Sequence, residues 1–306
     1  MQSRIKSEKV VIIGLGQLGL PVAKYVKEKG FETYGYDISV KAMERAEKIA
    51  RVKPVTDFGA NDFDVYILCV STHKPDDMFS PQIDGLFSIA DKISSEAKKD
   101  GALVAIESTI PRGTSKKVFE RVNHRLHVVH APHRWYALEE KEHGVNQLRV
   151  IGGMCECCLK AGTTFYSGYA SASGRQSESY PSSHNFRPSL GIPMHSLSNI
   201  EVAETTKVVE NAHRFLQIAF AEEIYLYCKA NNIDFPDLRD ALNTKWNVEI
   251  LEPREGIGGH CLPKDTKMFL QSSTLRRSKI LAAAMEADTD YKKYRAKREL
   301  QANAQV

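Results

Sequence analysis

The stretch that decides the fold is Val10-Val11-Ile12-Ile13-Gly14-Leu15-Gly16-Gln17-Leu18-Gly19. Its first four residues are β-branched and apolar, which is typical of a buried parallel strand. Three glycines follow in the pattern G-x-G-x-x-G, and the helical stretch 20–29 comes directly after them. A strand, a glycine turn and a helix in this order predict the phosphate-binding turn of a dinucleotide-binding α/β domain.

The next predicted strand, 31–36, ends at Asp37 and completes this pattern. Glycine lets the backbone approach a pyrophosphate closely, and the pyrophosphate rests on the helix N-terminus. A carboxylate at Asp37 accepts hydrogen bonds from the adenine ribose and repels a 2′-phosphate, so we expect NAD rather than NADP. The alternative is a purely structural α/β turn. The expected cofactor contacts here are Gly14, Gly16, Gln17, Leu18, Gly19 and Asp37.

Two further predicted strands, 64–70 and 102–106, are followed by polar residues. In open α/β sheets, ligands bind beyond the carboxyl ends of the strands, although any one such residue could simply form a turn or cap a helix. We expect a cofactor-lining set of Val70, Ser71, Thr72 and Ser108, with Thr109 beside it. After the predicted strand 126–129, His133 and Arg134 are candidates for substrate contact, the alternative for His133 being an ordinary surface histidine.

Composition and charge narrow the class of protein. The chain has 306 residues, 42% hydrophobic and 26% charged, as in globular proteins with room for two domains. A net charge of +4 is compatible with an anionic ligand but too small to indicate nucleic-acid binding. No apolar run approaches a membrane span, and the six scattered cysteines do not indicate a disulfide scaffold. We expect a cytoplasmic protein with no nucleic-acid or membrane partner.

Cys155-Glu156-Cys157-Cys158 follows another predicted strand, 148–152. Three cysteines in so short a stretch suggest a metal site, but the chain has no second cysteine pair at zinc-finger spacing. The expected structure is therefore the start of a helix, with no metal. Residues 169–190 are rich in serine and poor in aliphatic residues, which is typical of a disordered insertion or loop.

A long helix is predicted from Ser198 to about residue 231, and a second over 235–243. Ser198 and Glu201 form a capping box, and apolar residues cover so much of the long helix that we expect it to be largely enclosed. Lys207 and Asn211 lie four residues apart and face the same way. Because buried polar groups need partners, the two residues bond either a ligand, or one another and nearby carbonyls.

The stretch Gly256-Ile257-Gly258-Gly259-His260-Cys261-Leu262-Pro263-Lys264-Asp265 offers a cysteine after a flexible loop, with a lysine three residues later. A thiol in this setting is either an activated nucleophile or a buried, inert cysteine beside a turn.

Together, these motifs resemble the UDP-glucose/GDP-mannose dehydrogenase family, in particular its branch acting on UDP-N-acetyl-D-mannosamine and UDP-N-acetylglucosamine. The matching pieces are Gly14–Gly19, Ser108-Thr109 with Pro111 and Gly113, Ala203-Glu204 with Lys207 and Asn211, and Gly258–Asp265. The resemblance implies a Rossmann doubly wound parallel sheet at 1–197, followed by an all-helical domain at 198–306 that forms a homodimer through its long helix.

The resemblance also implies a reaction, in which NAD-dependent steps oxidise the C6 alcohol of a UDP-sugar to a carboxylate. Cys261 would form a thiohemiacetal and then a thioester. Lys207 and Asn211 would stabilise oxyanion character, while Asp265 and Thr109 would position water. Lys264 is expected at the cofactor, and Gly258 and Gly259 at the substrate.

This sequence departs from the family pattern in two ways. His133 stands where the family usually has a glutamate, and the chain ends before the family's C-terminal domain, which grips the nucleotide of the donor. A partner chain supplying that domain is one expectation. Two other functions stay open: a two-electron hydroxyacid-type dehydrogenase, and a non-catalytic NAD-binding partner of a full-length dehydrogenase.

Overall fold

The computed structural model describes residues 8–74, 76–77, 79–134, 144–168, 189–259, 261–272 and 278–303. The chain forms two compact units: Met1–Thr72 with Gln82–Lys207, and His73–Pro81 with Val208–Val306. The sequence predicts a domain boundary after residue 197. The first turns of the long helix belong instead with the first unit, because Ile200 lies in the core of its sheet.

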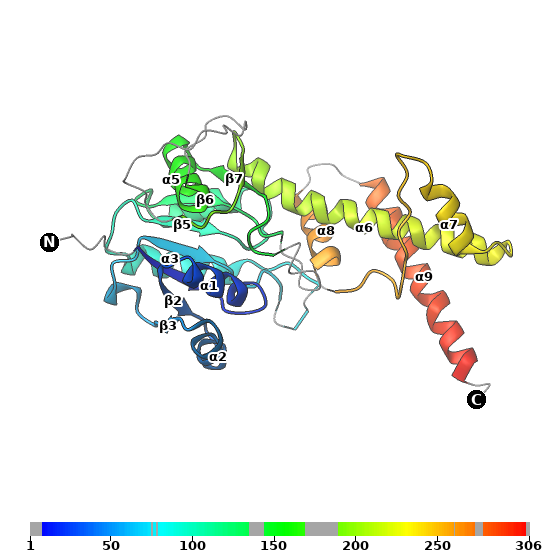
Figure 1. Ribbon diagram of the computed structural model, residues 1–306, viewed down its shortest axis with the longest axis horizontal. Coiled ribbons are helices and arrows are strands. Elements are labelled where there is room, and N and C mark those ends of the chain that lie inside the picture. Colours follow the sequence, from blue (N-terminus) through cyan, green and yellow to red (C-terminus); the bar gives the residue numbers. More distant parts are fainter. Residues whose placement is uncertain are drawn as a thin grey trace. The chain divides into compact units, whose positions relative to one another are not determined.

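The first unit is a sheet with helices on both faces (Figure 1). Its strands are β1 (Lys9–Ile13), β2 (Glu32–Tyr36), β3 (Lys53–Pro54), β4 (Val65–Leu68), β5 (Leu103–Ile106), β6 (His127–His130), β7 (Arg149–Gly153) and β8 (Met194–Ser196). Its helices are α1 (Gly19–Glu28), α2 (Val40–Ala50), η1 (Phe58–Ala60), α3 (Asp84–Glu96), α4 (Thr114–Arg121) and α5 (Glu156–Ser167).

The strand order is β3-β2-β1-β4-β5-β6-β7-β8, and of these described strands only β6 and β7 pair antiparallel. Successive residues of β1 face opposite sides of the sheet. Val10 and Ile12 pack in the core formed with α1, α2 and α5, whereas Val11 and Ile13 pack in the core formed with α3 and α4. The predicted doubly wound α/β fold is confirmed, with β1 at the point where the strand order reverses.

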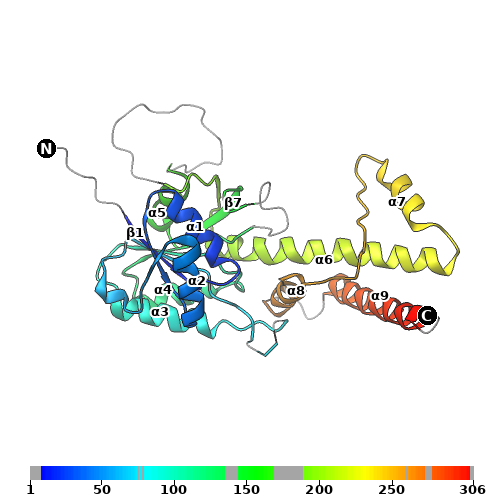
Figure 2. The same cartoon turned by 60° about the horizontal axis from the view of Figure 1, so that its bottom comes forward.

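The named elements of the second unit are helices, and an isolated antiparallel bridge pairs His73 with Pro81. The long helix α6 (Ile200–Ala230) continues into this unit, which also contains α7 (Phe235–Asn243), α8 (Cys261–Ser272) and α9 (Lys279–Asn303). Figure 2 shows α6 as one continuous helix. Phe215 and Ala219 of α6 pack with Ile257 and with Ala284 of α9 in one small core.

The start and the surface of α6 differ from prediction. Its first turn is capped by Asn199, whose side-chain oxygen accepts a hydrogen bond from the amide of Glu201, rather than by Ser198. The helix is also less enclosed than expected, because Val209 and Phe220 are 39% and 53% exposed. Residues 169–188 of the predicted insertion lie outside the described residues. No helix in the described ranges has the length and apolar character needed to cross a membrane.

Candidate active-site residues

The three glycines of the β1–α1 turn are required for three different reasons. Gly14 has a φ of +90°, and a Cβ there would lie 2.7 Å from the carbonyl oxygen of Cys69. A Cβ on Gly19 would lie 1.7 Å from the carbonyl oxygen of Gly14, so this glycine lets α1 pack directly on the turn. A Cβ on Gly16 would have no neighbour within 4 Å. Gly16 therefore leaves open the space that a pyrophosphate needs above the turn.

The N-terminus of α1 suits an anion. No side chain caps it, and its first turn holds no acidic residue. Asp37 lies beside the same turn, and its two oxygens accept hydrogen bonds from the backbone amides of Leu15 at 2.7 Å and Ser39 at 2.8 Å. Each oxygen keeps a lone pair for a ribose hydroxyl. The residues at this turn therefore fit a dinucleotide.

The polar residues after β4 and β5 have different surroundings. Ser108 is buried, and its hydroxyl donates to the carbonyl oxygen of Val70 at 2.7 Å. This bond ties the ends of the two strands together. Thr72 is also buried, whereas Ser71 is exposed and Thr109 half-buried. Ser71, Thr109 and the half-buried Val70 are thus the residues of this predicted set with exposed surface.

His133 belongs to a buried polar cluster at the ends of β5 and β6. Arg149 is fully buried, forms an ion pair with Glu107 at 3.0 Å and donates to Nε2 of His133 at 2.9 Å. The hydroxyl of Tyr166 donates to the other oxygen of Glu107 at 2.6 Å. Sequence reasoning singled out only His133 among these four residues, because Arg149 and Tyr166 stand in stretches that read as ordinary strand and helix.

The imidazole of His133 is neutral at physiological pH. Burial, the guanidinium of Arg149 and the ammonium of Lys207 together hold its pKa well below the usual value. Because arginine can only donate, Nε2 accepts and the ring proton is on Nδ1. His133 therefore brings no negative charge to the position where the resemblance implies a carboxylate. Its neighbour Arg134 is half-buried and donates to the carbonyl oxygen of Leu148.

Glu204, one helical turn before Lys207 on α6, is fully buried but has a structural role. Its carboxylate accepts hydrogen bonds from the backbone amides of Gly113 and Ser115, both at 2.6 Å, and so caps α4. Burial raises the pKa of Glu204, although these hydrogen bonds act to lower it. This contact docks the first turns of α6 onto the sheet and positions Lys207 beside the buried cluster.

In the second unit, Cys261 is the first residue of α8 and is exposed. It thus lies at a helix N-terminus, a position that favours a thiolate. One helical turn later, Asp265 is only 1% exposed. Its carboxylate ion-pairs with Lys264 at 2.6 Å and accepts a hydrogen bond from the side-chain amide of Asn211. The structure therefore brings together three predicted site residues from α6 and α8.

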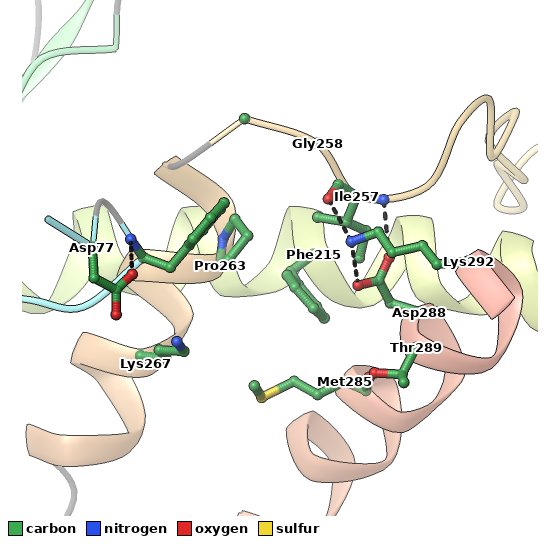
Figure 3. A pocket seen from close by; sticks show the side chains of 12 residues that line it. Asp77, Phe215, Ile257, Gly258, Pro263, Lys267, Met285, Asp288, Thr289 and Lys292 are labelled. Carbon is green, nitrogen blue, oxygen red and sulfur yellow. Dashed lines mark hydrogen bonds and ion pairs between the residues drawn. The ribbon is translucent and has the colours of Figure 1, made fainter. Parts of the chain in front are cut away.

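Gly258 and Gly259 line a cavity of about 380 Å³ within this unit. Figure 3 shows the preceding residue, Ile257, held by α9: its amide donates to Asp288, and its carbonyl accepts from Lys292. Two more residues of α9 hold the same segment, since Tyr291 donates to the carbonyl of Arg254 and Arg295 pairs with Glu255. The backbone leading to Cys261 is thus held by one helix.

Both units match known protein families. Residues 41–170 match the NAD binding domain of the UDP-glucose/GDP-mannose dehydrogenase family, and residues 201–289 match the central domain of that family. A UDP-N-acetyl-D-mannosamine dehydrogenase of Methanococcus maripaludis is 26% identical over 307 residues, covering 94% of this chain and 66% of that protein. One from Campylobacter jejuni is 27% identical, covering 92% and 71%. The chain spans about two thirds of the length of these relatives.

Solved structures agree on the fold. A UDP-N-acetyl-mannosamine dehydrogenase from Pyrococcus horikoshii matches with a TM-score of 0.78 and 23% identity, over 97% of this chain and 72% of that one. A 3-hydroxyisobutyrate dehydrogenase from Mycobacterium tuberculosis matches with a TM-score of 0.66 and 14% identity, over 95% and 94%. At these identities the likeness concerns the fold alone.

Proposed function

This chain belongs to the UDP-glucose/GDP-mannose dehydrogenase family and carries its NAD binding domain, and on that premise we propose that it oxidises a nucleotide sugar, with Cys261 as the nucleophile. NAD is the cofactor of this domain, as predicted. The proposed substrate is a UDP-N-acetylhexosamine, because the relatives named above are UDP-N-acetyl-D-mannosamine dehydrogenases. The proposed product is the corresponding uronic acid.

The observation that carries the proposal is the arrangement of α8. The helix begins at the exposed thiol of Cys261. One turn later lies the buried carboxylate of Asp265, which is held by Lys264 and Asn211. A preorganised amide is one of the groups that stabilise the oxyanion of a tetrahedral intermediate, and Asp265 holds the amide of Asn211 in place. A two-electron dehydrogenase needs no such nucleophile, so this arrangement favours the four-electron reaction.

The proposed reaction runs in two oxidations. The C6 alcohol first becomes an aldehyde. NAD⁺ held by the β1–α1 turn and Asp37 would supply the hydride acceptor for this oxidation, and a second NAD⁺ that for the next. The thiolate of Cys261 adds to the aldehyde carbon, forming a carbon–sulfur bond and a thiohemiacetal. Loss of a second hydride gives a thioester, which water cleaves to the carboxylate and the free thiol. Overall, one alcohol, two NAD⁺ and one water give one carboxylate, two NADH and three protons.

Each predicted residue has a task in this scheme. Lys207 and Asn211 stabilise the oxyanion, and Thr109 and Asp265 orient the water. Asp37 and the open face of Gly16 bind the adenosine and pyrophosphate ends of the cofactor, with Gly14, Gln17, Leu18 and Gly19 shaping that turn. The remaining proposed contacts are Val70, Ser71, Thr72, Ser108 and Lys264 to the cofactor, and His133, Arg134, Gly258 and Gly259 to the substrate.

The test is the amount of NADH formed per sugar, measured by absorbance with UDP-hexoses and UDP-N-acetylhexosamines. We expect two NADH per sugar and no acid from Cys261→Ala, while Cys228→Ala, which alters a buried cysteine of the same unit, keeps the stoichiometry of two. One NADH per substrate would indicate a two-electron hydroxyacid-type dehydrogenase instead. Binding of NAD without binding or turnover of any sugar nucleotide would indicate a non-catalytic partner.

We also propose that the chain forms a homodimer through α6. Val209, Phe220 and Tyr227 are 39%, 53% and 57% exposed. Their spacing places all three on one side of a helix with 3.6 residues per turn. Such an apolar stripe is suited to a matching helix. Sedimentation equilibrium should give a dimer that Phe220→Glu converts to a monomer, whereas Glu223→Gln, at an exposed position on the same helix, should leave the dimer intact.

A further inference from the structure

Three sulfur atoms gather at the N-terminus of α5. The Sγ of Cys155 lies 2.8 Å from that of Cys157 and 3.2 Å from that of Cys158. Cys155 is also the N-cap of the helix, where its sulfur accepts a hydrogen bond from the amide of Cys158. Cys155 and Cys157 are exposed, and Cys158 is buried.

An imidazole from another element joins these thiols. The ligand atoms of His127, Cys157 and Cys158 all lie within 4.8 Å of one another. The pairing of β6 with β7 explains why His127 lies near the cysteines, because these strands run antiparallel with Val129 opposite Gly153. This register brings the start of β6, at His127, alongside the end of β7 and the start of α5 (Figure 1). The sequence alone predicted a helix start without metal, because the spacing of the cysteines cannot reveal a histidine from a neighbouring strand.

We propose that His127, Cys155, Cys157 and Cys158 bind one zinc ion. Three thiolates and one imidazole form a common structural zinc set, and such sites are tetrahedral and closed to further ligands. With zinc–sulfur bonds of about 2.3 Å, tetrahedral geometry spaces the sulfurs by about 3.8 Å. The sulfur separations of 2.8 and 3.2 Å therefore need to widen by less than about 1 Å, which side-chain rotation at an exposed helix terminus allows.

Cysteine binds metal as the thiolate, so the three thiols release their protons when zinc enters. Zinc at this position would fasten the start of α5 to β6. With four protein ligands and no open position, the ion would have a structural role in the first unit.

The experiment measures zinc in the full chain purified under reducing conditions and then titrated with zinc, by plasma mass spectrometry. We expect about one zinc per chain in the wild type. Cys157→Ser and His127→Ala should each bind zinc at least about 100-fold more weakly, since loss even of groups that only support a ligand costs 10- to 100-fold. Cobalt substitution should give a thiolate-to-cobalt absorption band that weakens in Cys157→Ser.

Matched variants separate this site from other thiols and from the proposed function. Cys261→Ser and His213→Ala, which change an exposed cysteine and an exposed histidine elsewhere, should keep the full zinc content. Retained zinc in Cys261→Ser together with lost acid formation would support both proposals independently. The zinc site is refuted if the wild-type chain binds no zinc, or if Cys157→Ser and His127→Ala bind zinc as tightly as the wild type. It is also refuted if a disulfide between Cys155 and Cys157 persists under reducing conditions.

Discussion

The carboxylate of Asp265 on α8 accepts a hydrogen bond from the side-chain amide of Asn211 on α6. Lys264, the residue before Asp265, is only 5% exposed and has the same carboxylate as its ion-pair partner. A buried ammonium that loses its counter-charge is strongly destabilising. The carboxylate of Asp265 thus joins two helices through Asn211 and also pairs with a buried cation.

We expect Asp265→Asn to lower the free energy of unfolding by about 3–5 kcal/mol, because it removes the carboxylate charge that pairs with the buried ammonium of Lys264. Urea denaturation followed by circular dichroism measures this change. The matched control is Asp290→Asn, which breaks an ion pair with Lys293 whose side chains are 67% and 70% exposed. An exposed pair contributes less than about 1 kcal/mol. Equal effects of the two substitutions would contradict the buried role of Asp265.

Substitution by alanine should impair two glycines of the same turn in different ways: one loses stability and the other loses NAD affinity. Gly19→Ala places a methyl group on the carbonyl oxygen of Gly14 and should destabilise the fold by about 3 kcal/mol or more. Gly16→Ala meets no protein atom and should change stability by less than about 1 kcal/mol. It should nevertheless weaken NAD binding about tenfold or more, because the methyl group occupies the space of the pyrophosphate. Thermal unfolding and calorimetric titration with NAD separate the two effects, and unchanged NAD affinity in Gly16→Ala would contradict the proposed binding mode.

Two buried histidines should make the fold sensitive to acid. Burial lowers the pKa of His130 from 6.5 to about 3, and burial with the nearby cations lowers that of His133 well below 6.5. Below pH 6.5 the unfolded chain binds protons that the folded chain does not, so stability falls as pH falls. Each histidine contributes up to about 1.4 kcal/mol per pH unit.

Unfolding measured at pH 7, 6 and 5 should show this loss, and His133→Asn should reduce its slope by about 1.4 kcal/mol per pH unit, the share of one proton. His195→Asn, at an exposed position on β8, serves as the control and should keep the slope. The same slope in His133→Asn and in the wild type would mean that His133 is protonated in the folded chain.

Glu222 should act in the opposite direction. Its side chain is fully buried on α6, and burial together with the charge of Asp288 raises its pKa from 4.5 to about 8. Between these values the unfolded chain releases the proton first, so stability falls as pH rises across this window. Glu222→Gln should remove this dependence and stabilise the chain at pH 8 by about 1 kcal/mol or more. A variant less stable than wild type at pH 8 would show that the ionised carboxylate is favourable.

The sequence was most informative where neighbouring residues decide the structure. The β-branched run at 10–13 and the glycines after it predicted β1 and the turn of α1, and alternating burial along β1 follows from the same residues. The α7 helix was predicted at its observed bounds, because Asp234 caps it and proline follows at its start. These features depend on contacts within a few residues.

The sequence was least informative where the groups that meet are distant in the chain. Glu107, Arg149 and Tyr166 form one buried cluster with His133, yet no local pattern connects them. Similarly, Cys261 was predicted on a loop and is the first residue of a helix. The glycines before Cys261 predicted a loop and gave no sign of the helix that begins there. That helix is held in place by the hydrogen bond from Asn211 of α6 to Asp265. The assignment of chemical roles to these residues stays a prediction.

The contacts of α9 with residues 254–257 affect how the thiol of Cys261 is positioned. Tyr291, Lys292 and Arg295 hold three of these four residues from successive positions along one helix. None of the three side chains belongs to the proposed chemistry. A substitution, a ligand or a bound protein that shifts α9 would nevertheless move the backbone that leads to Cys261. The position of the cysteine is therefore tied to α9, whose Lys292 also lines the cavity of Gly258 and Gly259.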